Sequence, residues 1–331
     1  MDPDSYNGRN LITIPGFSNT HRDGHPHPVQ RASDKHPGIS ALLTVLLCTP
    51  ILFACQGTPV PDGTDRLVAP TVPGYAFDKP DATFRLPDAL HEISGLTVAG
   101  DTVIIAVQDE IGVLYGLSPD DGSIRWTTDF ADAGDFEGLE LVGDTVWVVR
   151  SDGRLFVIRP GSDHKTEVMD SGVDDDLNIE GLGWDTKSQR LLLAAKDYLR
   201  KSDNSRVVFS VRPSGRSPSA LSLEPAYAIP LDELASRFGV SANKARNFRP
   251  SGVAVHPTTG EVFVLSAGLR SIVVLAPQAS GAQKLLHVAL LDVDLLPQPE
   301  GLAFLGNGDL FVSSEDNNRG MLVRYNYRPT R

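Results

Sequence analysis

Short runs of apolar and β-branched residues recur along most of the chain, and Asp-Gly, Thr-Gly and Asn-Gly pairs separate many of them. This pattern is typical of antiparallel strands joined by tight turns, and it argues against a helical bundle. The runs fall into repeating sets. We expect second strands of these sets at 102–107, 145–149, 191–195, 262–265 and 310–313, third strands at 112–117, 155–158, 207–211, 271–275 and 321–325, and fourth strands at 123–127, 166–169, 226–229 and 286–290.

A short motif begins each set: a polar residue, any residue, Glu or Ser, Gly, then Leu or Val. Its glycines are 43, 43, 71 and 49 residues apart. Units of roughly 40 to 50 residues are the period of a β-propeller. The motif glycines are Gly95, Gly138, Gly181, Gly252 and Gly301.

The last unit reaches the C-terminus after three strands, while 82–86 is a spare strand ahead of the first motif. Pairing the two would close a ring without a free sheet edge. We therefore predict an all-β fold, a single β-propeller of five four-stranded blades closed by an N-terminal strand. The long third interval holds a helix-like insertion at 230–239, which Gly239 would end; a sixth, degenerate blade in that interval is the alternative.

The motif series carries a family resemblance. The strings Glu-Ile-Ser-Gly-Leu, Asp-Phe-Glu-Gly-Leu, Glu-Gly-Leu-Gly-Trp-Asp, Pro-Ser-Gly-Val-Ala-Val-His-Pro-Thr-Thr-Gly and Pro-Glu-Gly-Leu-Ala-Phe resemble the SdiA-regulated (YjiK-like) family of bacterial envelope β-propellers, over 86–331. The resemblance implies a propeller attached to the cell envelope or facing it, and no particular reaction. The wider group of similar propellers includes calcium-dependent phytases and metal-dependent lactonases, which keeps an enzyme open by analogy.

The N-terminal residues indicate that the protein is attached to a membrane. Residues 39–54 are 16 uncharged, mostly apolar residues followed by Cys55, a length that suits a signal-peptide core better than a bilayer span. Leu52-Phe53-Ala54-Cys55 resembles a bacterial lipobox, with Cys55 as the lipidated residue; an uncleaved anchor is the alternative. We expect a disordered leader, or a start codon placed too far upstream, at 1–38, a signal peptide or anchor at 39–55, a flexible linker at 56–73 and the propeller at 74–331.

Charge narrows the choice of partners. The 331 residues include 42 Asp and Glu against 30 Lys and Arg, for a net charge of −12. Such a chain repels a phosphate backbone, so nucleic acid is excluded as a general partner. The expected partners are the membrane, through the lipid or anchor, and an envelope protein or small ligand. The two cysteines, Cys48 and Cys55, leave no disulfide for the processed domain.

The residue before each motif glycine should recur around one ring in the central channel. Its three carboxylates repel one another, so they must bind a cation, pair with basic side chains or have raised pKa values. Oxygen ligands of this kind suit Ca²⁺ or Mg²⁺. The ring consists of Ser94, Glu137, Glu180, Ser251 and Glu300.

Residues at the ends of the second strands should surround one mouth of the channel. Arg150 and Lys196 follow these strands in the same blades as Glu137 and Glu180, and could neutralise them. Three interpretations remain: a structural ring paired to Arg150 and Lys196, a cation site on Glu137, Glu180 and Glu300, or a polar or anionic ligand site using Arg150 and Lys196. The acidic stretches 170–176 and 315–318 lack the spacing of a calcium loop and are expected to be solvated.

No nucleophile elbow, phosphate loop or zinc-protease motif occurs in the sequence. We therefore expect an envelope lipoprotein whose propeller is a binding or scaffold module, with Ca²⁺ or Mg²⁺ in the channel. The alternative is a metal-dependent hydrolase of phosphate esters or lactones, in which Glu137, Glu180 and Glu300 hold the cation. A third possibility is an interaction protein that grips its partner through loops such as 231–248.

Overall fold

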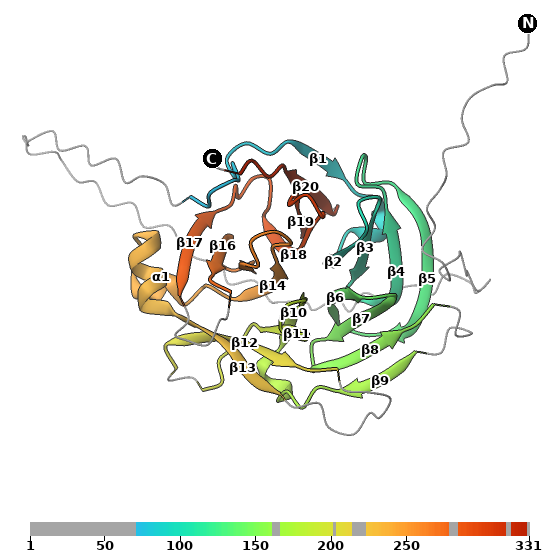
Figure 1. Ribbon diagram of the computed structural model, residues 1–331, viewed down its shortest axis with the longest axis horizontal. Helices are drawn as coiled ribbons and strands as arrows, with labels where there is room; N and C mark the ends of the chain where they lie inside the picture. The colour runs from blue at the N-terminus through green and yellow to red at the C-terminus, as the bar shows by residue number, and fades with distance from the viewer. Residues whose placement is uncertain are drawn as a thin grey trace, which may run out of the picture. The chain divides into compact units, whose positions relative to one another are not determined.

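Five four-stranded antiparallel sheets surround a central axis in the computed structural model, which describes residues 71–160, 166–200, 203–213, 223–277, 284–315 and 319–329 (Figure 1). Each sheet is one blade. The innermost strands of neighbouring blades contact one another all the way round, including the first and the last. The predicted five-bladed β-propeller is therefore confirmed.

The blades follow the order expected from the motifs, with the motif glycine near the start of each innermost strand. The first four blades are β2 (Ile93–Ala99), β3 (Val103–Gln108), β4 (Ile111–Leu117) and β5 (Ile124–Ala133); β6 (Phe136–Val142), β7 (Thr145–Arg150), β8 (Arg154–Ile158) and β9 (Glu167–Asp170); β10 (Ile179–Asp185), β11 (Arg190–Ala195), β12 (Ser205–Val211) and β13 (Glu224–Pro230); and β14 (Pro250–Val255), β15 (Val262–Ser266), β16 (Ser271–Leu275) and β17 (Leu285–Leu290).

The fifth blade combines both ends of the propeller. It contains β18 (Gln298–Phe304), β19 (Leu310–Glu315), β20 (Met321–Tyr325) and, as its outer strand, β1 (Ala82–Arg85). β1 pairs antiparallel with β20, Ala82 opposite Arg324 and Arg85 opposite Met321. The spare strand thus closes the ring as predicted, and no sheet edge is left between the first and last units.

Helices occupy the long third interval, so the alternative of a sixth blade is wrong. α1 (Leu231–Phe238) ends at Gly239, which is left-handed at φ 64°, the conformation that glycine adopts at little cost. α2 (Ala242–Ala245) follows, with Ser241 as its N-cap. Two single-turn 3₁₀ helices, η1 (Asp88–Leu90) and η2 (Asp175–Leu177), precede β2 and β10.

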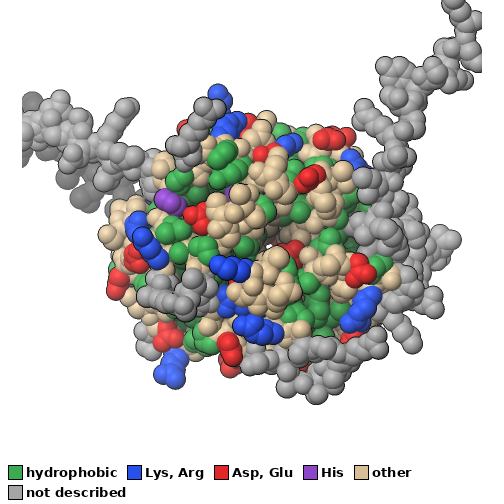
Figure 2. Space-filling view, in the orientation of Figure 1, with side chains coloured by type: hydrophobic (Ala, Val, Ile, Leu, Met, Phe, Trp, Pro, Cys, Tyr) green, Lys and Arg blue, Asp and Glu red, His purple; other side chains and the backbone are tan. Residues whose placement is uncertain are grey.

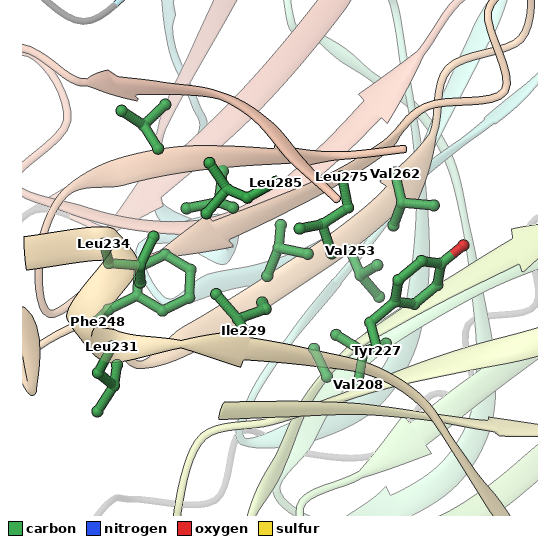
Figure 3. Packing of buried hydrophobic residues seen from close by; sticks show 14 of the residues in the cluster. Val208, Tyr227, Ile229, Leu231, Leu234, Phe248, Val253, Val262, Leu275 and Leu285 are labelled. Carbon is green, nitrogen blue, oxygen red and sulfur yellow. The ribbon is translucent and has the colours of Figure 1, made fainter. Parts of the chain in front are cut away.

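The hydrophobic core lies between blades rather than in one central mass. The cluster in Figure 3 joins β13 to the fourth blade, and Leu231 and Leu234 of α1 pack into its outer part beside Phe248. Because each strand lies between two such interfaces, strands such as β3, β11 and β15 are buried along their whole length. Both faces of the middle strands must therefore be apolar, which the sequence satisfies.

The motif glycines lie where the innermost strands approach most closely. A Cβ on Gly95 or on Gly181 would stand 2.7 Å from the Cα of the motif glycine of the next blade. No side chain fits at that separation, which explains the recurrence of Gly. The close approach also brings the residues beside the glycines together from all five blades.

The predicted leader, the apolar run, Cys55 and all but the last three residues of the predicted linker lie outside the described residues. Within the described ranges, no helix is both long enough and apolar enough to cross a bilayer.

Candidate functional site

The side chains that precede the motif glycines meet at one narrow part of the channel. A cavity of about 10 Å³ there is lined by Glu137, Glu180, Ser251 and Glu300. Ser94 joins the ring through its Oγ, which donates to the Glu137 main-chain oxygen at 2.7 Å and to Glu137 Oε2 at 3.2 Å. All five residues that the motif placed in one ring therefore lie together. The cavity has room for about one water molecule.

Glu180 has a cationic partner in its own blade. Lys196, directly after β11, donates from Nζ to Glu180 Oε1 at 2.5 Å, and only 4% of the Glu180 side chain is exposed. Burial raises the pKa of Glu180, against the attraction of Lys196. Burial works against the Lys196 ammonium as well, but the carboxyls of Glu180, Glu137 and Glu300 outweigh it and raise the pKa of Lys196. Lys196 is therefore charged throughout the physiological range.

Glu137 holds its proton at neutral pH, and the pKa of Glu300 is shifted in the same direction. Burial, together with the nearby Glu180, Asp135 and Glu300 carboxyls, raises the pKa of Glu137 to about 10. Burial and the charges of Glu180 and Glu315 raise the pKa of Glu300 well above its ordinary value. The charges of Lys196 and Arg249 do not balance three carboxylates in so small a volume, so the proton on Glu137 supplies part of the missing positive charge.

Further carboxyls lie where the channel opens beyond this ring. Burial and the neighbouring Glu92 raise the pKa of Asp109 to about 6. Burial and Asp109 raise the pKa of Glu315 to about 7. Glu92 Oε2 lies 3.4 Å from His91 Nε2, and Asp109 Oδ1 is buried without a hydrogen-bond partner among the described residues. We call Glu92, Asp109, Asp135 and Glu315 the acidic mouth.

Figure 2 looks down the axis of the ring, where acidic side chains lie at the centre and basic ones beside them. Arg249 Nη2 contacts Asp197 Oδ1 at 2.8 Å, in the segments that follow β11 and precede β14. Arg249 also acts on the ring, because its positive charge works against burial and lowers the pKa of Glu180.

Arg150 does not neutralise Glu137, contrary to one of the sequence interpretations. Its Nη2 and Nε contact the carboxylate of Asp152 at 2.5 and 3.0 Å. Asp152 lies only two residues further on, in the turn before β8. Because Asp152 is so near in the chain, Arg150 pairs with it rather than with Glu137. Lys196 is thus the basic side chain that the structure brings to the ring, and Arg150 serves the turn.

The acidic stretch before β10 is solvated, as expected. Asp170, Asp174, Asp175 and Asp176 are exposed, and Asp174 caps η2 by accepting from the Asp176 amide. Of the stretch 315–318, only Glu315 lies within the described residues. Over the described ranges, no group of three or more His, Cys, Asp or Glu side chains is arranged closely enough to hold a metal as it stands.

Sequence analysis missed the larger hollow at the other end of the channel. This cavity has a volume of about 500 Å³, and Glu140 of β6 lies in its wall. Counting from the motif glycines, the residues equivalent to Glu140 are Thr97, Gly183, Ala254 and Ala303. Glu140 is the one charged residue among these five equivalent positions. That difference could have pointed to a site at this end of the channel.

No protein-family model matches the sequence, and no curated protein matches it. Solved structures that it resembles include a glutaminyl cyclase from Myxococcus xanthus, 14% identical, with a TM-score of 0.50 over 76% of this chain and 97% of that one. A protein assigned as a gluconolactonase is 13% identical, with a TM-score of 0.49 over 81% and 98% of the two chains. The similarity to the cyclase supports the propeller fold alone.

Proposed function

We propose that this chain is an envelope-tethered binding module whose channel takes up a divalent cation, Ca²⁺ or Mg²⁺, between the Glu ring and the acidic mouth. The lipobox-like sequence ending at Cys55 supports the tether. The resemblance of the motif series to the SdiA-regulated family supports an envelope location. Neither argument depends on the channel, so the envelope location and the cation binding are tested separately.

The observation that carries the cation is the convergence of Glu137, Glu180 and Glu300 on one cavity with a single ammonium beside them. The proton on Glu137 offsets part of the remaining repulsion at neutral pH, and the raised pKa of Glu300 acts in the same direction. A divalent cation would replace those protons and bring carboxylate and hydroxyl oxygens, its preferred ligands, around one charge.

The residues present fit such an ion in chemistry. Glu137, Glu300 and Ser251 offer oxygen donors, and one Glu180 oxygen is already engaged by Lys196. Uptake would therefore need the carboxyls to turn inward, because they do not form a ready site as they stand. Proton release on binding is the expected signature of this rearrangement.

The test is calorimetric titration of CaCl₂ and MgCl₂ into the chelator-treated full chain in two buffers of different ionisation enthalpy. We expect binding with release of protons and an affinity that rises with pH. The variant Glu137→Gln, Glu180→Gln, Glu300→Gln should lose it. A control with the same charge change at the surface, Glu224→Gln, Glu233→Gln, Glu261→Gln, should keep it.

Two results would change the assignment. If neither ion binds, or if the surface variant loses as much as the channel variant, the Glu ring is structural and the module binds through another surface. If the cation-loaded protein turns over phosphate esters or lactones in a screen, the hydrolase alternative replaces the binding module.

A further inference from the structure

The hollow at the Glu140 end is formed by every blade of the ring. All five innermost strands, β2, β6, β10, β14 and β18, supply lining residues near their C-terminal ends, and so do the turns after β10 and β14. Its volume of about 500 Å³ is in the range of pockets that bind small molecules. The channel cavity beside the Glu ring holds about one water and is not comparable.

The channel is narrow between the two ends, where the motif glycines of neighbouring blades approach one another. Leu96 and Leu302 line both cavities, and Leu139, Leu182 and Val253 line the narrow one. These five residues follow the motif glycines directly. Because the narrow cavity has a volume of only about 10 Å³, it does not admit the organic ligand that the large hollow could hold.

Glu140 is fixed in the hollow by its neighbours. Its Oε1 accepts from Thr97 Oγ1 at 2.6 Å and from the Leu141 amide at 2.8 Å, and its Oε2 accepts from the Trp184 amide at 3.1 Å. These donors come from three consecutive blades. The Thr97 hydroxyl and the two amides all donate hydrogen bonds, so they hold the Glu140 carboxylate in one orientation. The remaining lone pairs of the carboxylate can accept hydrogen bonds from a ligand.

The other charged groups round the hollow do not neutralise Glu140. Asp185 is paired with Arg190 at 3.1 Å. Lys187 is exposed in the turn after β10. Burial lowers the pKa of His256, so its ring is neutral at pH 7 and above. With Glu140 ionised, the inner wall of the hollow carries a net negative charge, while Lys187 is at its exposed rim.

The rest of the wall suits an apolar body. Trp184, Tyr227 and Phe304 line the hollow together with Pro257 and Pro277. Aromatic rings attract cations as well as apolar groups, through the negative face of the ring. A carboxylate beside aromatic and proline surfaces is the combination that recognises an amine attached to an apolar group.

We propose that this hollow binds a small organic cation with an apolar body, whose ammonium group contacts the Glu140 carboxylate. The site is distinct from the proposed cation site and does not depend on it. Aliphatic and aromatic amines of a size that fits about 500 Å³ are the expected class.

Binding should depend on pH in a defined direction. Burial raises the pKa of Glu140 to about 7, against the hydrogen bonds from Thr97, Leu141 and Trp184. Below pH 7 the carboxyl is protonated and offers no charge. A cationic ligand therefore binds more tightly as the pH rises from 6 to 8, provided that the ligand keeps its own charge.

The test uses three probes of similar shape in calorimetric titrations of the full chain at pH 6 and pH 8: benzylamine, benzyltrimethylammonium and the neutral benzyl alcohol. We expect both cations to bind more tightly than the alcohol at pH 8, by about tenfold, which is the usual effect of a charged hydrogen-bond partner or ion pair in a pocket. The difference should shrink at pH 6. The permanent charge of benzyltrimethylammonium assigns that change to the protein.

Two variants and a control test whether the cation binds beside Glu140. Glu140→Gln should reduce cation binding about tenfold at pH 8 and remove its pH dependence. Lys187→Glu, an exposed change that leaves Glu140 in place, should strengthen cation binding two- to threefold. Glu224→Gln should change neither. Equal affinity for benzyl alcohol, binding that both site variants leave unchanged, or no benzylamine binding at millimolar concentration would overturn the proposal.

Discussion

Lys196 and Glu180 form an ion pair, 2.5 Å from Nζ to Oε1, in which the carboxylate side chain is almost fully buried and the ammonium side chain is 30% exposed. Glu180 is the second residue of β10, and Lys196 directly follows the neighbouring strand β11. The pair is therefore local to one blade. It supplies an ammonium whose pKa all three channel carboxyls raise.

Removing Lys196 should destabilise the fold. In Lys196→Met the Glu180 carboxylate loses its partner and must either stay charged while buried or take up a proton. We expect a loss of about 2 kcal/mol in the free energy of unfolding at pH 7, less than for a fully buried pair, measured by urea denaturation. Adding Glu180→Gln should recover part of the loss. Lys244→Met, at an exposed position, is the control, and an equal effect there would contradict the assignment.

Glu137 should make the protein less stable as the pH rises. Its pKa is raised to about 10 in the folded state from about 4.5 unfolded, so the unfolded state loses its proton first. Stability is fully present below pH 4.5 and decreases as the pH rises towards 10. Glu137→Gln keeps the shape without the ionisation.

The measurement for Glu137 is the free energy of unfolding from pH 4 to 9. The variant should match the wild type near pH 4, exceed it by a margin that grows by up to about 1.4 kcal/mol per pH unit between pH 5 and pH 8, and show a flatter profile. Glu224→Gln should follow the wild-type profile. A variant less stable than the wild type at pH 8 would show that Glu137 is ionised and paired in the folded protein.

Gly181→Ala should be among the most damaging small substitutions in the chain. The added Cβ would lie 2.7 Å from the Gly252 Cα, and backbone must move to admit it. We expect a loss above about 3 kcal/mol in thermal or urea unfolding. Gly143→Ala has positive φ but no atom within 4 Å of its Cβ, so strain alone should cost it about 1 kcal/mol. Similar losses for both would refute the packing argument.

Replacing Arg206 by lysine should destabilise the fold. Its Nε and Nη2 donate to the carbonyls of Phe248 and Arg246 at 2.7 and 2.9 Å, and its guanidinium lies 3.5 Å from the centre of the Tyr198 ring. Lysine keeps the positive charge, but its ammonium cannot donate to both carbonyls in the geometry of a guanidinium and has no flat surface to stack on the Tyr198 ring. We expect Arg206→Lys to lose about 2–3 kcal/mol and to release the α2 segment to proteolysis. Arg212→Lys, on an exposed side chain, should lose less than about 0.5 kcal/mol.

The sequence was sufficient for the architecture because each blade repeats the same physical constraint. Close approach of the innermost strands demands Gly at one position, and the chain shows it five times. The helix in the third interval was also predictable, since Gly239 has no Cβ to oppose the left-handed turn. The ring of Ser and Glu follows from the same register.

The partners of the ring were harder to predict. Arg150 and Lys196 occupy equivalent places after their strands, yet Lys196 pairs with Glu180 while Asp152 holds Arg150. The difference depends on what the next turn contains, and strand periodicity does not encode it. Glu140 was missed for a related reason: the hollow exists only when the strand ends of five blades are brought together, and the single carboxyl two residues after a motif glycine stands out only when the five motifs are aligned.

The closing strand determines how the propeller would respond to a mechanical load. β1 precedes the first blade in the chain but is hydrogen-bonded into the last sheet, over four residue pairs, and Arg328 fastens Asp81 just before it. Tension applied from the N-terminal side would first pass through Val72 and Phe77, which pack between the fourth and fifth blades, and would then reach the β1–β20 seam before it reached the strands of the first four blades. Each of those blades is a continuous meander, so the seam should separate first, and the ring would open as a chain of intact sheets.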